Sequence, residues 1–260
     1  MEKKRASIAI VTGASSGMGR EFVRQIAESY RSISEIWVIA RREQALLTLQ
    51  EELKDKTTIR TLPMDLAEKD ACAELAALLK KEKPVIRILV NSAGLGHAGK
   101  LETQDVDQIL NMIDVNCRAL PAVTMTCLPY FRKGSRILQM DSGSAFLPQP
   151  GFAAYAASKA YVLSLSRALK EELRSRQISV TAVCPGPVKT DFFATGGIKL
   201  NPVKRLFLIK PERVVRKALF DAEKGKAVSI SGGSMKLVRA ASGVLPQGLM
   251  TRLSAMLFSF

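Results

Sequence analysis

A tyrosine and a lysine lie one helical turn apart in the segment Tyr155-Ala-Ala-Ser-Lys159. A tyrosine with an ordinary pKa near 10 transfers protons poorly at neutral pH unless its phenolate is stabilised. An ammonium four residues further along lies on the same helix face and would lower that pKa toward the working range. Without further partners such a pair is usually a surface contact, so it indicates an active site only in a supporting context.

A glycine-rich turn near the N-terminus supplies part of that context. The apolar run Ser7–Val11 is followed by Thr12-Gly13-Ala-Ser-Ser-Gly17-Met-Gly19 and then by a helical pattern. Strand, glycine-rich turn and helix in this order are what a dinucleotide site requires, because glycine allows a close backbone approach and the helix N-terminus binds the pyrophosphate. The spacing excludes a P-loop, and the alternative is a tight turn that binds nothing.

The end of the second predicted strand carries the sequence Ala40-Arg41-Arg42. Dinucleotide folds use an acidic residue here for the ribose 2′-hydroxyl, or an arginine for a 2′-phosphate. No acidic residue occurs between the end of this strand and Glu43. The guanidinium group of arginine matches the geometry of a phosphate. We therefore expect NADP(H) as the cofactor, with a solvated helix start as the alternative reading of the two arginines.

Short apolar runs alternate with helical patterns along the chain. The runs are nearly continuous, as in parallel strands covered by helices on both faces. This repetition predicts an α/β fold with a doubly wound parallel sheet (Rossmann fold) of about seven strands, in a single domain over residues 1–260. The predicted strands are Ser7–Val11, Glu35–Ile39, Thr58–Leu62, Arg87–Val90, Arg136–Met140, Ser179–Val183 and Ala227–Ile230, and the predicted helices include Gly17–Tyr30, Arg42–Lys54, Glu68–Lys81, Gln104–Arg132 and Ala153–Arg176.

The glycine-rich turn Thr12–Gly19, the segment Tyr155–Lys159 and the motifs named below resemble those of the short-chain dehydrogenase/reductase family in order and spacing. The resemblance extends over most of the chain. The resemblance implies that Asn116, Ser142, Tyr155 and Lys159 are catalytic. Ser142, thirteen residues before Tyr155, takes the place of the catalytic serine, which leaves Ser144 as a loop or capping residue. Its hydroxyl would bond the substrate oxygen as negative charge develops there. The resemblance further implies that Lys159 holds the nicotinamide ribose, and that Asn116 holds a water between Lys159 and solvent.

Further segments resemble the cofactor contacts of the family. Asp65-Leu66 resembles its adenine-contacting pair, Asn91-Ser-Ala-Gly94 its N-N-A-G motif with Ser92 in place of the second asparagine, and Pro185–Thr190 its nicotinamide-contacting stretch. The implied cofactor-binding residues are Gly13, Ser15, Ser16, Gly17, Met18, Gly19, Arg41, Arg42, Asp65, Leu66, Asn91, Ala93, Gly94, Tyr155, Lys159, Pro185, Gly186, Val188 and Thr190.

Composition narrows the choice of partners. One histidine and four scattered cysteines give no metal-ligand spacing, so we expect no metal, and His97 is interpreted as a loop or pocket-wall residue. The net charge of +15 favours anionic partners. No basic stripe interleaved with aromatic residues accompanies that charge, so we expect no nucleic-acid binding. No apolar stretch approaches the roughly 20 residues of a membrane span, so we expect a cytoplasmic protein. We also expect it to form a homodimer or a homotetramer.

The C-terminal third is expected to shape the substrate site. Residues 192–210 are apolar with basic flanks and are interpreted as a lid over a lipophilic substrate, or as a helix on the core. Residues 232–260 form a helical extension, in which Leu245, Leu249, Leu253 and Met256 or Leu257 make an apolar stripe opposite Gln247, Thr251 and Ser254. Core packing or a subunit contact is the favoured use of this stripe. Closure of the pocket or contact with an anionic membrane are the alternatives.

Together these features predict an NADP(H)-dependent oxidoreductase. It would reduce a ketone or aldehyde, or oxidise a secondary alcohol, with Tyr155 as the proton donor or acceptor. The alternative is a non-catalytic NADP(H)-binding regulatory protein, against which the complete serine, tyrosine and lysine set argues. Nothing in the sequence chooses the substrate.

Overall fold

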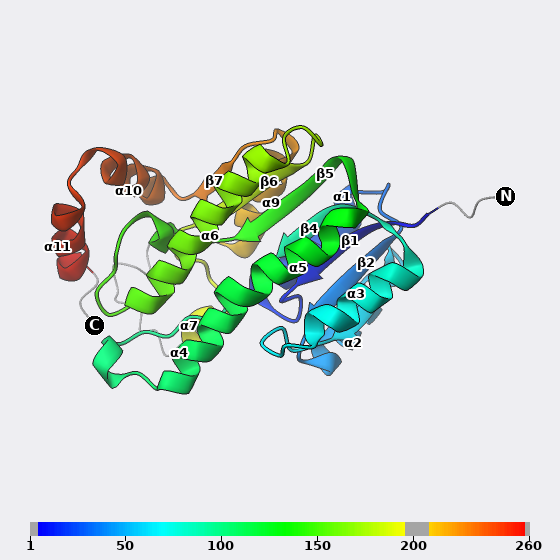
Figure 1. The fold of residues 1–260 in the computed structure, drawn as a ribbon, viewed down its shortest axis with the longest axis horizontal. Coiled ribbons are helices and arrows are strands. Elements are labelled where there is room, and N and C mark those ends of the chain that lie inside the picture. Colours follow the sequence, from blue (N-terminus) through cyan, green and yellow to red (C-terminus); the bar gives the residue numbers. More distant parts are fainter. Residues whose placement is uncertain (1–4, 196–207, 258–260) are drawn as a thin grey trace.

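A seven-stranded parallel sheet lies at the centre of the computed structural model, which describes residues 5–195 and 208–257 (Figure 1). The strand order β3-β2-β1-β4-β5-β6-β7 reverses direction between β1 and β4, so the predicted doubly wound α/β fold is confirmed. The strands are β1 (Ser7–Thr12), β2 (Glu35–Ala40), β3 (Thr58–Pro63), β4 (Val85–Asn91), β5 (Phe131–Met140), β6 (Ser179–Pro185) and β7 (Val228–Ser231).

Helices cover both faces of the sheet (Figure 1). One face packs against α1 (Gly17–Ser29), α2 (Glu43–Leu53) and α9 (Pro211–Glu223). The other packs against α3 (Ala71–Glu82), α5 (Leu120–Cys127) and the long α6 (Ala153–Glu172). The remaining elements are α4 (Val106–Ile113), α7 (Phe192–Thr195), α10 (Gly233–Val244), α11 (Gln247–Leu257), the π-helical turn η2 (Asp114–Ala119) and the 3₁₀ turns η1 (Leu101–Thr103), η3 (Leu128–Tyr130) and η4 (Gly143–Phe146).

Strand β1 shows why the apolar runs are continuous. Ala9 and Val11 belong to the core cluster beneath α1, α2 and α9, whereas Ile8 and Ile10 belong to the cluster on the opposite face. All four side chains are fully buried. Because successive side chains of a strand point to opposite faces, a strand covered on both sides must be apolar at every position.

The predicted single helix Gln104–Arg132 is wrong. The chain forms α4, then η2, then α5, and after η3 the strand β5 begins at Phe131, five residues before the predicted Arg136. Pro121 has no N–H to donate to the carbonyl of Cys117, and the helix widens into a π turn just before it. Pro129 interrupts the pattern again in η3. Helix α6 also ends at Glu172, four residues before the predicted Arg176.

The two C-terminal helices also differ from the prediction. Pro246 separates α10 from α11, so Leu245 lies outside the helix that carries the rest of the predicted stripe. Over residues 247–256 of α11, the buried side chains are Met250 and Ser254, which are 7% and 1% exposed, whereas Leu249 is 47% exposed. The predicted apolar face is therefore rotated, and Ser254 points inward. Among the described residues, no helix is both long and apolar enough to cross a membrane.

The packing of α1 gives a prediction about stability. Phe22 is fully buried between α1 and the sheet, so we expect Phe22→Ala to lower the free energy of unfolding by about 3–5 kcal/mol. The same substitution at Phe220, which is 51% exposed on α9, serves as the matched control and should change it by less than about 1 kcal/mol. Urea unfolding followed by circular dichroism measures both, and similar losses for the two variants would contradict this packing.

Candidate functional site

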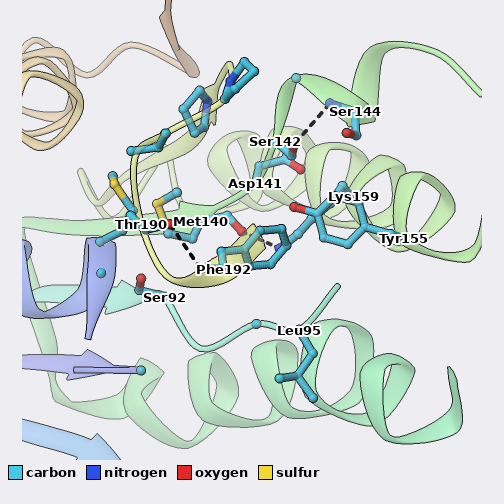
Figure 2. A pocket seen from close by; sticks show the side chains of 18 of the residues that line it. Ser92, Leu95, Met140, Asp141, Ser142, Ser144, Tyr155, Lys159, Thr190 and Phe192 are labelled. Atoms are coloured by element: carbon cyan, nitrogen blue, oxygen red, sulfur yellow. Dashed lines mark hydrogen bonds between the residues drawn. The ribbon is translucent and has the colours of Figure 1, made fainter. Parts of the chain in front are cut away.

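A cavity of about 890 Å³ opens at the carboxyl edge of the sheet, where the strand order reverses. Figure 2 shows part of it, with Ser142, Tyr155 and Lys159 on one wall and Thr190 and Phe192 nearby. Its walls come from the turn after β1, from the ends of β2 to β6, and from α6, α7, α10 and α11. One cavity thus joins segments that are distant in the sequence.

The turn after β1 packs tightly against the loop after β4. Gly13 has a φ of +67°, and a Cβ there would lie 2.7 Å from the backbone nitrogen of Ala93. A Cβ on Gly19 would collide with the carbonyl of Gly13. The Thr12 hydroxyl accepts hydrogen bonds from the Ser92 and Ala93 amides, each 3.0 Å long. Only glycine allows this close approach, and the cradle that results leaves bare backbone facing the cavity.

Two arginines lie at the edge of the cavity beside this turn. The Arg41 guanidinium forms an ion pair of 3.6 Å with Asp65, and the Arg42 guanidinium donates to the Ser15 hydroxyl at 3.1 Å. Both arginines line the cavity. Asp65 offsets part of the charge of Arg41, whereas the partner of Arg42 is neutral. This end of the cavity therefore offers a positively charged site for an anionic group.

Tyr155 and Lys159 are both buried on the face of α6 that meets the cavity, at 6% and 4% exposure. The Lys159 ammonium donates to the carbonyl of Met140 at 2.9 Å and lies 5.7 Å from the centre of the Tyr155 ring. The Tyr155 ring stacks on Phe152 and contacts Phe192, with centroid distances of 4.2 and 5.6 Å. These contacts hold the phenol beside Ser142 (Figure 2).

The expected lowering of the Tyr155 pKa is not seen among the groups of this chain. Burial raises the pKa of Tyr155 above its usual range, and the nearby Asp141 carboxylate raises it further. A hydrogen bond with Ser142 acts in the opposite direction. Burial also lowers the pKa of Lys159, while Asp141 raises it. Desolvation is the largest cause of both shifts, because both side chains are enclosed.

Asp141, which the sequence reasoning did not select, lies beneath the catalytic candidates. It is 3% exposed, and its Oδ2 accepts a hydrogen bond from the Cys184 thiol at 3.3 Å. Its Oδ1 has no hydrogen-bond partner in the part of the chain that the structure describes. Burial raises its pKa to about 7, although Lys159 and the hydrogen bond from Cys184 oppose the shift. A carboxylate that ends a buried strand directly before Ser142 was the signal for it in the sequence.

The two predicted asparagines lie behind the cavity wall. The Asn116 side chain accepts from the amide of Leu95 at 3.0 Å and donates to the Leu95 carbonyl and the Ser158 hydroxyl. A Cβ on Gly94 would lie 3.3 Å from Asn116 Oδ1 and 3.5 Å from Lys159 Nζ, so the amide and the ammonium flank the same glycine. Asn91 donates to Thr124 and Gln139 inside the protein.

The other predicted catalytic and cofactor residues all line the cavity. Ser144 lines it as well, and its backbone amide donates to the Ser142 hydroxyl at 3.1 Å. His97 is not among the lining residues, and its carbonyl accepts a hydrogen bond from Gln104. Of the predicted lid, residues 196–207 lie outside the described residues, while Phe192 and Phe193 contribute to the wall. Within residues 5–195 and 208–257, no group of three or more potential metal ligands occurs.

The family model for short chain dehydrogenases matches residues 7–198. The chain belongs to the short-chain dehydrogenase/reductase family. Family membership agrees with the sheet order and with the glycine turn described above. It makes the chain an oxidoreductase of a family whose solved structures include nicotinamide cofactor complexes.

Individual short-chain dehydrogenases resemble the chain over most of its length. Sulfoacetaldehyde reductase 2 of Chromohalobacter salexigens is 34% identical, over 74% of this chain and 77% of the relative. A short chain dehydrogenase of Pseudocercospora fijiensis is 35% identical over 72% of this chain, which spans only 61% of that longer relative. A short-chain dehydrogenase from Sphingobium yanoikuyae, solved in complex with NADPH, is 27% identical with a TM-score of 0.80, over 94% of this chain and 95% of that one.

The buried Asp141 gives a prediction about pH. Because its pKa is raised on folding, the folded state holds its proton more tightly, and stability falls as the pH rises from about 4 toward 7. Asp141→Asn removes this dependence, so the unfolding free energy of the wild type should fall relative to the variant by about 1 kcal/mol per pH unit between pH 5 and 7.

Urea unfolding at a series of pH values measures this difference. Asp55→Asn, in an exposed turn, controls for the loss of one negative charge. Parallel curves for the wild type and Asp141→Asn across this range would show that the carboxyl is not held neutral by the fold.

Proposed function

We propose that this short-chain dehydrogenase uses NADP(H) to reduce a ketone or aldehyde, or in reverse to oxidise a secondary alcohol. One observation carries the proposal. A single cavity connects the glycine cradle and the two arginines to the Ser142, Tyr155 and Lys159 side chains. A dinucleotide bound along the cradle would therefore lie in the same space as a group that can donate a proton.

The residues present fit a phosphorylated dinucleotide. A side chain at Gly13 or Gly19 would collide with neighbouring backbone, so glycine is what lets this turn pack tightly at the N-terminus of α1. Both glycines line the cavity there, where a pyrophosphate would bind. Solved structures of this fold hold NADPH in some cases and NAD in others, so the preference must come from the chain itself. Arg41 and Arg42 would hold a 2′-phosphate, while the Arg41 partner Asp65 would face the adenine end. When bound, the reduced cofactor supplies the hydride.

The catalytic residues then handle the proton. The Ser142 hydroxyl would donate a hydrogen bond to the substrate carbonyl oxygen, where negative charge develops. Tyr155 would give its proton to that oxygen, and its raised pKa keeps the phenol protonated until the oxygen becomes strongly basic. Lys159, held by the carbonyl of Met140, would stabilise the phenolate after the transfer. We assign Asn116 a positioning role, because its amide holds the Leu95 backbone.

We further propose that the protein forms a homodimer or a homotetramer. Several large apolar side chains on α4 and α5 are open to solvent, which supports a subunit contact there. Val106, Leu110 and Met125 are 69%, 57% and 67% exposed. Exposed apolar side chains gathered on one surface often mark a protein interface.

Removal of the Tyr155 hydroxyl tests the catalytic assignment. We expect Tyr155→Phe to lower kcat for carbonyl reduction by about 10²- to 10⁴-fold, because general acid catalysis contributes on this order. The Kd for NADPH, measured by fluorescence titration, should change little, since the ring and its stacking on Phe152 remain. Tyr161→Phe, on the exposed side of the same helix, is the control. NADPH consumption at the wild-type rate by Tyr155→Phe would exclude Tyr155 as the proton donor.

Replacement of the arginines tests the cofactor preference. In the double variant Arg41→Ala/Arg42→Ala we expect the affinity for NADPH to fall by about 10- to 100-fold while that for NADH changes little, because only NADPH carries the 2′-phosphate. Arg174→Ala, on an exposed residue near the far end of α6, is the control. Calorimetric titration with both cofactors gives the ratio, and wild-type protein that binds NADH more tightly than NADPH would overturn the assignment.

A further inference from the structure

The two C-terminal helices form an apolar wall of the cavity. In Figure 1, α10 and α11 lie beyond β7, at the opposite end of the molecule from α2 and α3. The segment from Met235 to Ser254 contributes seven apolar residues and one hydroxyl to the lining. The apolar residues are Met235, Leu237, Val238, Ala241, Leu245, Met250 and Leu253.

This wall begins directly beside the catalytic candidates. Helix α10 packs on η4, which follows Ser142, and its Met235 side chain occupies the space that a Cβ on Gly143 would need. A Cβ on Gly186 would also lie 3.0 Å from the Met235 side chain. The glycines of two loops thus make room for the Met235 side chain of α10, which lies next to the residue that follows Ser142.

The hydroxyl of Ser254 stands out within this wall. Ser254 is 1% exposed and lines the cavity, and its Oγ has no hydrogen-bond partner among residues 5–195 and 208–257. Serine in a helix commonly bonds the carbonyl four residues earlier, as Thr251 on the same helix does with Gln247. A buried hydroxyl left without a partner destabilises the protein, and a ligand that pairs with it recovers that free energy.

We propose that the substrate is an elongated apolar carbonyl compound with an uncharged hydrogen-bonding group at the end remote from the carbonyl. Its body lies against α10 and α11, and its remote hydroxyl or carbonyl pairs with Ser254. The remote group is uncharged, because none of the lining residues that α10 and α11 contribute is charged and a buried ion would go unpaired. This inference rests on the proposed function and extends it to the substrate class.

Binding without turnover tests the proposal first. The probes are butan-2-one, octan-2-one, dodecan-2-one and dodecan-2-one with a terminal hydroxyl, titrated by calorimetry into protein loaded with NADP⁺. Each added methylene should tighten binding by up to about fourfold, as apolar burial predicts. The terminal hydroxyl should tighten it further. Equal affinity for the short and the long ketones would overturn the proposal.

The variant Ser254→Ala tests the contact itself. It should weaken binding of the hydroxylated ketone by about tenfold and leave that of dodecan-2-one unchanged. Its Tm should equal or exceed that of the wild type, because the lost hydroxyl has no partner, whereas a structural role would lower the Tm. Thr251→Ala, on the exposed side of α11, is the matched control. If Ser254→Ala lost the same affinity for both ketones, Ser254 would contribute packing alone and the proposed hydrogen bond would be wrong.

Reduction of the same ketones with NADPH tests the proposed function separately from the proposed substrate class. Tight binding of the long ketones without any NADPH oxidation would contradict the proposed function and leave the binding assignment standing. NADPH oxidation with a kcat/KM that is independent of chain length would support the function and overturn the substrate class.

Discussion

The shape of the cavity depends on one backbone contact. The turn after β1 packs directly against the loop after β4. Gly13 lies against Ala93, and the Thr12 hydroxyl binds the amides of Ser92 and Ala93. This contact joins the two halves of the sheet where the strand order reverses. The pairing of β1 with β4 holds the halves together along the strands, but a bulkier turn would shift the cradle relative to Tyr155 and Lys159.

Burial governs the chemistry of the other half of the site. Tyr155, Lys159 and Asp141 are all nearly inaccessible to solvent, so burial dominates the pKa shift of each, and the Asp141 carboxylate raises the pKa of both Tyr155 and Lys159. Desolvation keeps the tyrosine protonated and favours neutral Asp141, while Lys159 is held by a backbone carbonyl. This enclosed arrangement suits a proton donor better than a permanent phenolate.

The fold was largely predictable from local patterns, and the errors have local physical causes. Continuous apolar runs identified all seven strands, because burial on both faces demands them. The single helix predicted over 104–132 failed at Pro121 and Pro129, where a missing N–H alters the helix although the apolar pattern continues. On α11, Pro246 removed Leu245 from the predicted stripe, and Ser254 faces inward.

The sequence by itself determined the fold class, the family, the glycine turn and the identity of the Tyr155 and Lys159 pair. These depend on residue type and short spacing, which a linear chain displays directly. Tertiary structure alone decided that Asp141 is buried near Lys159 and Tyr155, that Asn91 and Asn116 support the wall from behind, and that α10 and α11 line the cavity. Such relations depend on which distant segments pack together and on how deeply they are buried, and no spacing along the chain records either.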